Sequence, residues 1–370
     1  MTHVAATPAA QAKAKSCTPA LPWKPSSGMI PYRIAGSAIV AKAQSESTSV
    51  AAPASPAEAE RAWEPVSDDG DVRVSRAGNV VKVTLTRTRN GNALSDSMVD
   101  GITKLFTDMA KDPTIFQIIL TAEGKFFCTG MDLSASGSTA QNDPEVKDAY
   151  YRKIEGLFSA IMNSPQTTIA VVDGLCFGGG VGLTFACDVR LVSSASRWTM
   201  TEIKLGLSPA TISRQMVREW GVSFAREAML SGRQVTPTEL KAIGAVHGIA
   251  ESGGDLEKMV AEYLEGLKTS APRSATAIKE LTRLGWTDPG GDEQTKYVKE
   301  VFAGMIEPGS EGEYGMAQFR KKVKKVDWAA FWAEKQSASG SEVLGPKISK
   351  HRSQSTFVNI RSIRSTLPIG

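Results

Sequence analysis

Between residues 72 and 192, apolar residues fall into short runs and helical stripes. Runs with the length and composition of buried strands occur at 72–74, 80–85, 118–120, 168–172 and 189–192. Apolar residues recur at three- and four-residue steps over 96–111 and 143–163, which predicts two amphipathic helices. Because strands and helices alternate, we expect an α/β fold with a mainly parallel sheet.

From about Ala210 onward the pattern changes and predicts helices almost throughout. The helical segments are 212–219, 222–230, 236–243, 254–268, 274–284, 292–306 and 313–322. Glycine or proline residues interrupt the pattern between several of them. A last third made of helices predicts a helical cap or an assembly surface beside the sheet.

Both ends of the chain are polar and basic, with few large apolar residues. Residues 1–45 hold five basic residues and no acid, and residues 336–370 hold five basic residues and one acid. The remaining residues, 46–335, therefore carry a net charge of −5. We divide the chain into a disordered basic tail (1–69), an α/β core (70–270), a C-terminal helical region (271–335) and a second disordered basic tail (336–370).

The N-terminal tail has two interpretations. An acid-free, Ser-rich, basic segment is typical of an organelle transit peptide, which would place the protein in mitochondria. Prolines at 8, 19, 22 and 25 interrupt an early helix, so a disordered tail of a cytoplasmic or peroxisomal protein is the alternative. The last four residues, 367–370, differ from the Ser-Lys-Leu type of peroxisomal signal.

Composition excludes several classes of function. No apolar run reaches the roughly 18 residues that a membrane-spanning helix needs, so we expect no membrane partner. The net charge of +4 is too small to indicate nucleic acid as a partner. The four cysteines form no Cys-x-x-Cys pair and the chain has three histidines, so we expect neither a bound metal nor a disulfide scaffold.

Two glycine-containing loops directly follow predicted strands. The first covers 124–133 and the second covers 173–182. In open α/β sheets, ligands bind beyond the carboxyl ends of the strands. Gly178, Gly179 and Gly180 open a short predicted helix, and the free N–H groups at a helix N-terminus suit a phosphate or an oxyanion.

The glycine run matches neither of the common phosphate-binding motifs. No Gly-Lys-Ser/Thr follows it, which excludes a P-loop. Leu183 stands where a Gly-x-Gly-x-x-Gly motif has its last glycine. Close packing of a helix against a strand is the alternative reason for three small residues in a row.

A third segment, 198–209, carries an acid among apolar residues. Glu202 is flanked by Met200, Ile203 and Leu205. Desolvation by such neighbours would raise the pKa of Glu202 and suit it to carry a proton near neutral pH. Taken alone, a surface glutamate at a strand end is the simpler explanation.

Together these segments resemble the crotonase (enoyl-CoA hydratase/isomerase) superfamily. The resemblance runs from about Val72 to Trp332, includes 87–94 and 319–322, and rests on several motifs in the same order and spacing. It implies a crotonase-like spiral of ββα units with a C-terminal helical trimerisation region, and hence a homotrimer or hexamer. It also implies a coenzyme A thioester as the substrate, no separate cofactor, and reaction through a stabilised enolate.

The resemblance also implies roles for individual residues. The backbone amides of Met131 and Gly179 would bind the enolate oxygen as preorganised donors, and Glu202 would carry the proton. The implied substrate-binding positions are Arg89, Lys125, Gly130, Asp132 and Gly178. The two cationic side chains fall along the CoA path and could meet its phosphates, although a solvated surface position explains each of them nearly as well.

The catalytic acids depart from the two-glutamate pattern of hydratases. Its first position is Gly182 here, and its second is Glu202, preceded by Thr201 rather than Pro. One glutamate suffices for the proton shift of an enoyl-CoA isomerase, whereas hydration ordinarily uses two groups. The surrounding segments look like those of methylglutaconyl-type hydratases, which favours hydration or dehydration of a branched enoyl-CoA. Asp132 is a candidate second carboxylate, with capping of the turn after Gly130 as its alternative role.

A non-catalytic function is the rival from another class. The chain could be a CoA-binding or scaffold protein that lost an acid, or an RNA-associated member that uses the basic tails. Retention of Glu202 beside both glycine loops favours an enzyme. Candidate walls of an acyl pocket are Phe126, Phe127, Phe177 and Trp198, although large aromatic residues at strand ends are core residues more often than not.

Overall fold

Two β-sheets organise the part of the chain that the computed structural model describes, residues 62–132 and 143–338. The larger sheet holds, from edge to edge, β1 (Glu64–Asp68), β2 (Val72–Ala77), β3 (Val80–Leu85), β4 (Gln117–Ala122), β6 (Thr167–Val172), β8 (Val189–Ser193) and β11 (Gly248–Ala250). The smaller sheet holds β10 (Gln234–Val235), β9 (Arg197–Thr199), β7 (Leu175–Phe177) and β5 (Phe126–Cys128). Strand pairs from β3 to β11 are parallel and those from β1 to β3 are antiparallel, which confirms the predicted mainly parallel sheet.

The chain alternates between the two sheets as it advances. β4 of the larger sheet is followed by β5 of the smaller one, and β6 with β7 and β8 with β9 repeat the step. The connecting helices are α2 (Asp96–Met109), α3 (Pro144–Met162) and α4 (Gly179–Ala186). This repetition is the predicted α/β spiral of ββα units.

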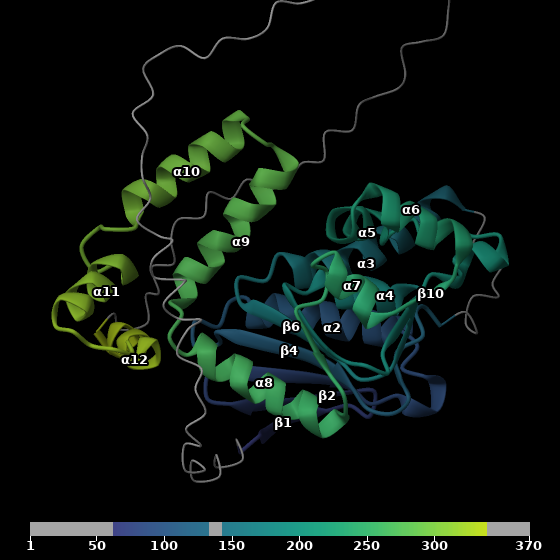
Figure 1. The fold of residues 1–370 in the computed structure, drawn as a ribbon, viewed down its shortest axis with the longest axis horizontal. Helices are drawn as coiled ribbons and strands as arrows, with labels where there is room; N and C mark the ends of the chain where they lie inside the picture. The colour runs from purple at the N-terminus through teal and green to yellow at the C-terminus, as the bar shows by residue number, and fades with distance from the viewer. Residues whose placement is uncertain (1–61, 133–142, 339–370) are drawn as a thin grey trace, which may run out of the picture. The chain divides into compact units, whose positions relative to one another are not determined.

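Alternate residues of the strands of the larger sheet enter two different apolar clusters. Ile119 of β4 packs in one cluster with Leu256 of α8 (Gly253–Leu267), which covers this face of the sheet (Figure 1). Ile118 and Leu120 point the other way and join Phe106 of α2 in the main core. The central strands are therefore buried on both faces, as their continuous apolar sequences require.

The connecting helices begin in different ways. Ser95 caps α2 by accepting a hydrogen bond from the Met98 amide at 3.3 Å, and Asp143 caps α3 by accepting one from the Glu145 amide at 2.8 Å. By contrast, α4 begins after Gly178 with no side chain capping its amides. The N-terminus of α4 consequently keeps N–H groups that can serve a ligand.

Helices dominate after Ala210, as predicted. They are α5 (Ser213–Trp220), α6 (Val222–Ser231), α7 (Pro237–Ala242), α8, α9 (Pro272–Thr287), α10 (Asp292–Gly304), α11 (Glu311–Arg320) and α12 (Trp328–Ala338). The prediction was incomplete, because β10 and β11 interrupt the helices. α12 was not among the predicted segments, although most of it lies in the predicted helical region 271–335. β10 and β11 are two and three residues long, which is too short to show a periodic pattern, and their partners β9 and β8 lie far away in sequence.

The boundaries of the predicted tails differ from the structure in two places. β1 begins at Glu64, inside the segment 1–69 that was expected to be disordered, and pairs with β2. α12 runs to Ala338, beyond the expected boundary at 335. The rest of both predicted tails, residues 1–61 and 339–370, lies outside the described residues. None of the helices in the described ranges is long and apolar enough to cross a membrane.

Candidate active site

The two glycine loops meet at the start of α4, where backbone approaches backbone. Gly130 has φ +92°, and a Cβ there would stand 3.0 Å from both the Gly179 nitrogen and the Phe177 oxygen. A Cβ on Gly180 would stand 2.8 Å from the carbonyl carbon of Cys128. Only glycine allows this contact, so the close-packing explanation of the glycine run is correct and is also what assembles the site.

Two backbone amides, those of Gly179 and Met131, point away from other protein acceptors. Within residues 62–132 and 143–338, neither donates a hydrogen bond to another protein group. The Met131 nitrogen lies 3.6 Å from where a Cβ on Gly179 would stand. Leu94 fixes the peptides around Met131, because its amide donates to the Gly130 oxygen at 2.8 Å and its oxygen accepts from the Asp132 amide at 3.0 Å. Two neighbouring N–H groups without a protein acceptor are suited to bind an oxyanion.

Glu202 places a carboxyl group beside this site. It lies near the start of a short 3₁₀ helix, η4 (Thr201–Leu205), where its carbonyl accepts from the Leu207 amide at 2.9 Å. Its Oε1 is 3.0 Å from the position of a Cβ on Gly178, and its Oε2 is buried without a hydrogen-bond partner. Burial raises the pKa of Glu202 above its usual value, and a hydrogen bond from its own backbone amide opposes that rise. The group is suited to carry a proton near neutral pH.

The position of the first glutamate of two-glutamate hydratases is closed by apolar side chains. A Cβ on Gly182 would collide with the side chain of Ile212 and stand 2.7 Å from Cε1 of Phe158. The side chains of Ile212 and Phe158 are each 1% exposed. No carboxyl group fits at residue 182 in this packing. Glu202 is therefore the only one of the two hydratase glutamates that this chain has.

Asp132 forms an ion pair rather than facing the Glu202 carboxyl group. Its Oδ2 accepts a hydrogen bond from Arg87 Nη1 at 2.8 Å, and the same nitrogen donates to the Ala93 oxygen at 2.8 Å. The pair is mostly buried, with the two side chains 21% and 12% exposed. The structure thus favours a positioning role for Asp132, next to the Met131 amide.

Arg87 is a residue that the sequence analysis did not single out. It lies two residues after β3, whereas Asp132 follows β5. Their separation of 45 residues leaves no local pattern that would identify the pair. The only signal in the sequence is an arginine directly after a strand end that faces the predicted ligand edge.

Arg89 and Lys125 lie on loops at the carboxyl ends of β3 and β4. Arg89 is exposed in the 3₁₀ helix η1 (Thr88–Asn90), and Lys125 is exposed with its Nζ 5.6 Å from the ring centre of Phe126. Neither side chain forms an ion pair within the described part of the chain, and neither contacts the Glu202 carboxyl. Both cations remain accessible to an anionic ligand that approaches this edge.

Of the four aromatic wall candidates, two belong to the core. Phe127 and Trp198 are 1% and 0% exposed. Phe126 and Phe177 are half-buried, with ring centres 6.2 Å apart. Among the described residues no group of three or more His, Cys, Asp or Glu side chains is placed to hold a metal ion.

Comparison with known proteins agrees with this fold. The family model described as enoyl-CoA hydratase/isomerase matches residues 75–330. Enoyl-CoA hydratase AFT6-1 of Alternaria alternata is 40% identical over 257 residues, which cover 69% of this chain and 83% of that protein. The mitochondrial methylglutaconyl-CoA hydratase of Homo sapiens is 29% identical over 204 residues, which cover 54% of this chain and 59% of that protein.

Solved structures give the same result. The crystal structure of an enoyl-CoA hydratase/isomerase from Marinobacter aquaeolei has a TM-score of 0.64 and 28% identity, covering 70% of this chain and 99% of that one. Pseudomonas aeruginosa AtuE has a TM-score of 0.65 and 27% identity, with the same coverage. The fold is that of a family whose members act on CoA thioesters. The chain belongs to the enoyl-CoA hydratase/isomerase family of the crotonase superfamily.

Proposed function

We propose that the enzyme adds water to an enoyl-CoA, and removes it in reverse, with Glu202 as its single carboxyl proton carrier. The observation that carries the proposal is the buried, unpartnered Oε2 of Glu202 beside Gly178, at the helix N-terminus that presents the Gly179 amide. The amides of Met131 and Gly179 bind the thioester oxygen and stabilise the enolate as charge develops on it.

One carboxyl group can complete the reaction by giving back the proton that it takes. The Glu202 carboxylate accepts a proton from water while the water oxygen forms a bond to C3 of the enoyl group. The electron pair of the C2–C3 double bond moves toward the thioester oxygen, which the two amides hold as an enolate. The protonated Glu202 then donates to C2, which restores the thioester carbonyl and the carboxylate.

The substrate class that we propose is a branched enoyl-CoA. The similarity to a methylglutaconyl-CoA hydratase supports this choice, since its name specifies a branched acyl group. The substrate carries its own coenzyme, and the steps above use only water and protein groups, so we propose that no separate cofactor is needed. Activity should then survive exhaustive dialysis against a chelator.

The closed position at Gly182 favours one alternative, a Δ3-Δ2 enoyl-CoA isomerase. In that reaction Glu202 takes a proton from C2 of a 3-enoyl-CoA and returns it to C4. Both reactions use the same amides and the same carboxyl group. They differ in whether an oxygen atom from water enters the product.

The test offers purified enzyme crotonyl-CoA, 3-methylglutaconyl-CoA and a 3-enoyl-CoA in water labelled with ¹⁸O. We expect ¹⁸O on C3 of the product that forms from 3-methylglutaconyl-CoA. The rate should fall by about 100-fold or more in Glu202→Gln. Glu251→Gln, at an exposed position after β11, is the matched control and should keep the wild-type rate.

The outcomes separate the candidate functions. Conversion of the 3-enoyl-CoA without label, and no hydration of the other two thioesters, would establish the isomerase instead. Equal inactivity of the wild type and Glu202→Gln on all three thioesters, with CoA binding retained, would establish the CoA-binding scaffold.

We propose that the C-terminal helices mediate self-association into the trimer or hexamer that the family resemblance implies. α10 buries none of its residues, and Phe302 on α10 and Phe319 on α11 are 70% and 81% exposed. Large exposed apolar residues on a helix that buries none of its own residues are typical of a protein interface. Light scattering should give three or six times the chain mass, and Phe302→Asp should reduce it. A monomeric wild type would contradict the proposal.

We also propose that residues 1–69 direct the chain to mitochondria. Those residues fused to a fluorescent protein should accumulate there, and a cytosolic or peroxisomal signal would contradict the proposal. A separate expectation concerns nucleic acid, which we do not expect the protein to bind. A gel-shift comparison of the full chain with a form that lacks both tails checks this, because RNA binding by the full chain alone would instead assign the tails that role.

A further inference from the structure

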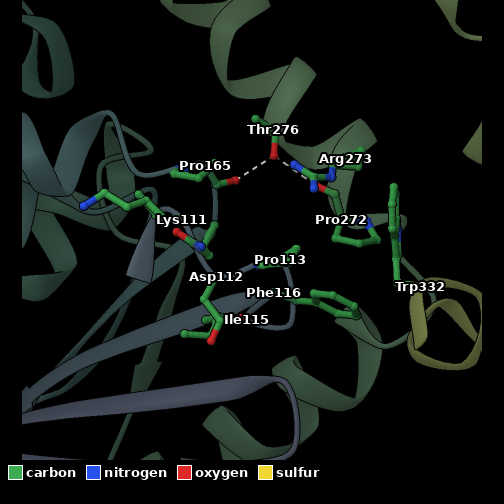
Figure 2. Close-up of a pocket in the computed structure, with 12 residues that line it drawn as sticks. Lys111, Asp112, Pro113, Ile115, Phe116, Pro165, Pro272, Arg273, Thr276 and Trp332 are labelled. Carbon is green, nitrogen blue, oxygen red and sulfur yellow. Dashed lines mark hydrogen bonds between the residues drawn. The ribbon is translucent and has the colours of Figure 1, made fainter. Parts of the chain in front are cut away.

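A cavity lies away from the Glu202 site, between the α/β core and the C-terminal helices. Its volume is about 260 Å³. The core contributes the segment between α2 and β4, which includes Pro113 and Phe116, and the residues just before β6. Arg273 of α9 and Trp332 of α12 lie next to each other on the opposite wall (Figure 2).

The cavity and the proposed active site lie toward opposite ends of the central strands of the larger sheet. Lys111 to Phe116 precede the first residue of β4, and Pro165 and Gln166 precede the first residue of β6. Gly130 and Gly179 instead come after the carboxyl ends of β4 and β6, beyond the short strands β5 and β7 of the smaller sheet. The cavity and the glycine loops therefore lie toward opposite ends of β4 and β6.

Arg273 lines the cavity with a guanidinium group that has no hydrogen-bond partner in the described part of the protein. Its guanidinium carbon lies 5.0 Å from the ring centre of Trp332, and the side chain is half-buried. The guanidinium group makes no hydrogen bond or ion pair with any residue of the described ranges. Partly buried N–H donors without acceptors are costly, and a guanidinium presents two parallel donors that match a carboxylate or phosphate.

Glu311 holds Arg273 and Trp332 in place. Its carboxylate accepts from the backbone amide of Arg273 at 2.9 Å and from the indole nitrogen of Trp332 at 2.8 Å. It also accepts from the amide and the hydroxyl of Ser274, so its oxygens are fully occupied. Glu311 therefore orients the backbone of Arg273 and leaves the guanidinium N–H groups to another partner.

The other polar groups that line the cavity already have partners. Asp112 accepts from the amide and hydroxyl of Thr114 and from Arg76. The Gln166 amide nitrogen donates to the Met109 oxygen at 2.6 Å, and the Lys111 ammonium pairs with Asp108 at 3.1 Å. Arg76 offsets the charge of Asp112, and the Glu311 carboxylate interacts electrostatically with Arg273. What distinguishes Arg273 is that its guanidinium N–H groups have no hydrogen-bond acceptor among the described residues.

We propose that this cavity binds a small organic anion, with its carboxylate on Arg273 and its apolar body against Trp332 and Phe116. The volume is below the roughly 300 to 1,000 Å³ of sites for drug-sized ligands, so the ligand is much smaller than CoA. The walls combine polar groups with the apolar surfaces of Pro113, Pro165 and Pro272, so they suit an anion that carries a hydrophobic group better than inorganic phosphate.

Isothermal titration of the full-length enzyme with benzoate tests the proposal, with benzamide and inorganic phosphate as comparison probes. We expect benzoate to bind one site per chain, and both other probes to bind at least about 10-fold more weakly. Arg273→Gln should weaken benzoate binding by about 10-fold or more, and Arg273→Lys by less, because lysine keeps the charge but loses the paired donors. Arg283→Gln is the matched control on the same helix, where Arg283 pairs with Glu280 at the surface.

Several results would overturn the proposal. They are no binding of benzoate, equal binding of benzamide, equal binding of benzoate by Arg273→Gln, and tighter binding of phosphate than of benzoate. Unfolding of Arg273→Gln would be detected by circular dichroism, and Trp332→Leu would then provide the same comparison. Benzoate binding by Glu202→Gln should match the wild type, which separates this site from the active site.

Discussion

Glu202 Oε1 lies 3.0 Å from the point where a Cβ on Gly178 would stand. Gly178 has φ +46° and precedes the first residue of α4, so its missing side chain leaves room for the carboxyl group directly at the helix N-terminus. The proton carrier and the Gly179 donor are thus held together by two adjacent glycines.

Gly178→Ala should displace the Glu202 carboxyl group and lower kcat by about 100-fold, since misplacement of a reacting group by about 1 Å has that effect. The positive φ will also cost some stability. Gly78→Ala is the control, because Gly78 has φ +61° but open space around it. Steady-state kinetics should show normal kcat for Gly78→Ala, and a normal kcat for Gly178→Ala would contradict the contact.

Glu202→Gln should make the protein more stable at neutral pH while removing activity. Burial raises the pKa of Glu202 in the folded state above the ordinary 4.5, so the unfolded chain ionises first as pH rises. The stability contributed by the protonated carboxyl is therefore full below about pH 4.5 and lost as pH rises through the folded pKa.

Thermal unfolding across pH measures this effect. The melting temperature of Glu202→Gln should exceed that of the wild type at pH 7, and the difference should vanish near pH 4. Glu251→Gln, at an exposed position, is the control for replacement of a surface carboxyl group. A wild type that is more stable than Glu202→Gln at pH 7 would mean that the carboxylate has a stabilising partner.

Gly182→Glu should destabilise the protein without restoring a two-glutamate site. The new side chain would collide with Ile212 and Phe158 in a core that has no space for it. Overpacking costs about 1–3 kcal/mol, and burial of a carboxyl group adds to this. Denaturant unfolding measures the loss, with Gly156→Ala in α3 as a helix-glycine control that should gain about 0.5–1 kcal/mol. A higher rate of enoyl-CoA hydration in Gly182→Glu would contradict the conclusion that residue 182 has no space for a carboxyl group.

Asp132→Asn should lower kcat, because Asp132 positions the neighbouring Met131 amide. The shape of the pH–rate profile should not change. Asp132 pairs with Arg87 and does not exchange a proton with the substrate in the proposed mechanism. A double-mutant cycle with Arg87→Ala and Asp132→Ala should give a coupling of about 1–3 kcal/mol in unfolding free energy. Loss of one limb of the pH–rate profile in Asp132→Asn would instead identify Asp132 as a second catalytic carboxylate.

Local patterns in the sequence were sufficient to predict α2 and α3. The stripe of apolar residues over 96–111 predicts α2, which ends at Met109, and the Asp-Pro pair at 143–144 predicts the capped start of α3. The short strands β5, β7 and β9 were not expected, because three residues carry no measurable period. These strands form the smaller sheet, so its existence depends on packing that the local sequence does not encode.

The candidate site likewise has residues that the sequence predicts and contacts that it does not. Gly130, Gly178, Gly179 and Glu202 were identified because their residue types and order match a known family, and the structure brings them together. The filling of the space at Gly182 by Ile212 and Phe158 could not be predicted, since the three residues belong to separate helices and loops. The Arg87–Asp132 pair is equally nonlocal.

The two donors of the oxyanion site belong to the main chain, which limits how mutation can inactivate the enzyme. Every residue except proline carries the same N–H group, so substitution of the Met131 side chain cannot delete its donor. The vulnerable positions are instead the glycines, where any added carbon pushes the loops apart. We therefore expect inactivating variants in a saturation screen to concentrate at Gly130 and Gly180, while residue 131 accepts diverse side chains and rejects proline.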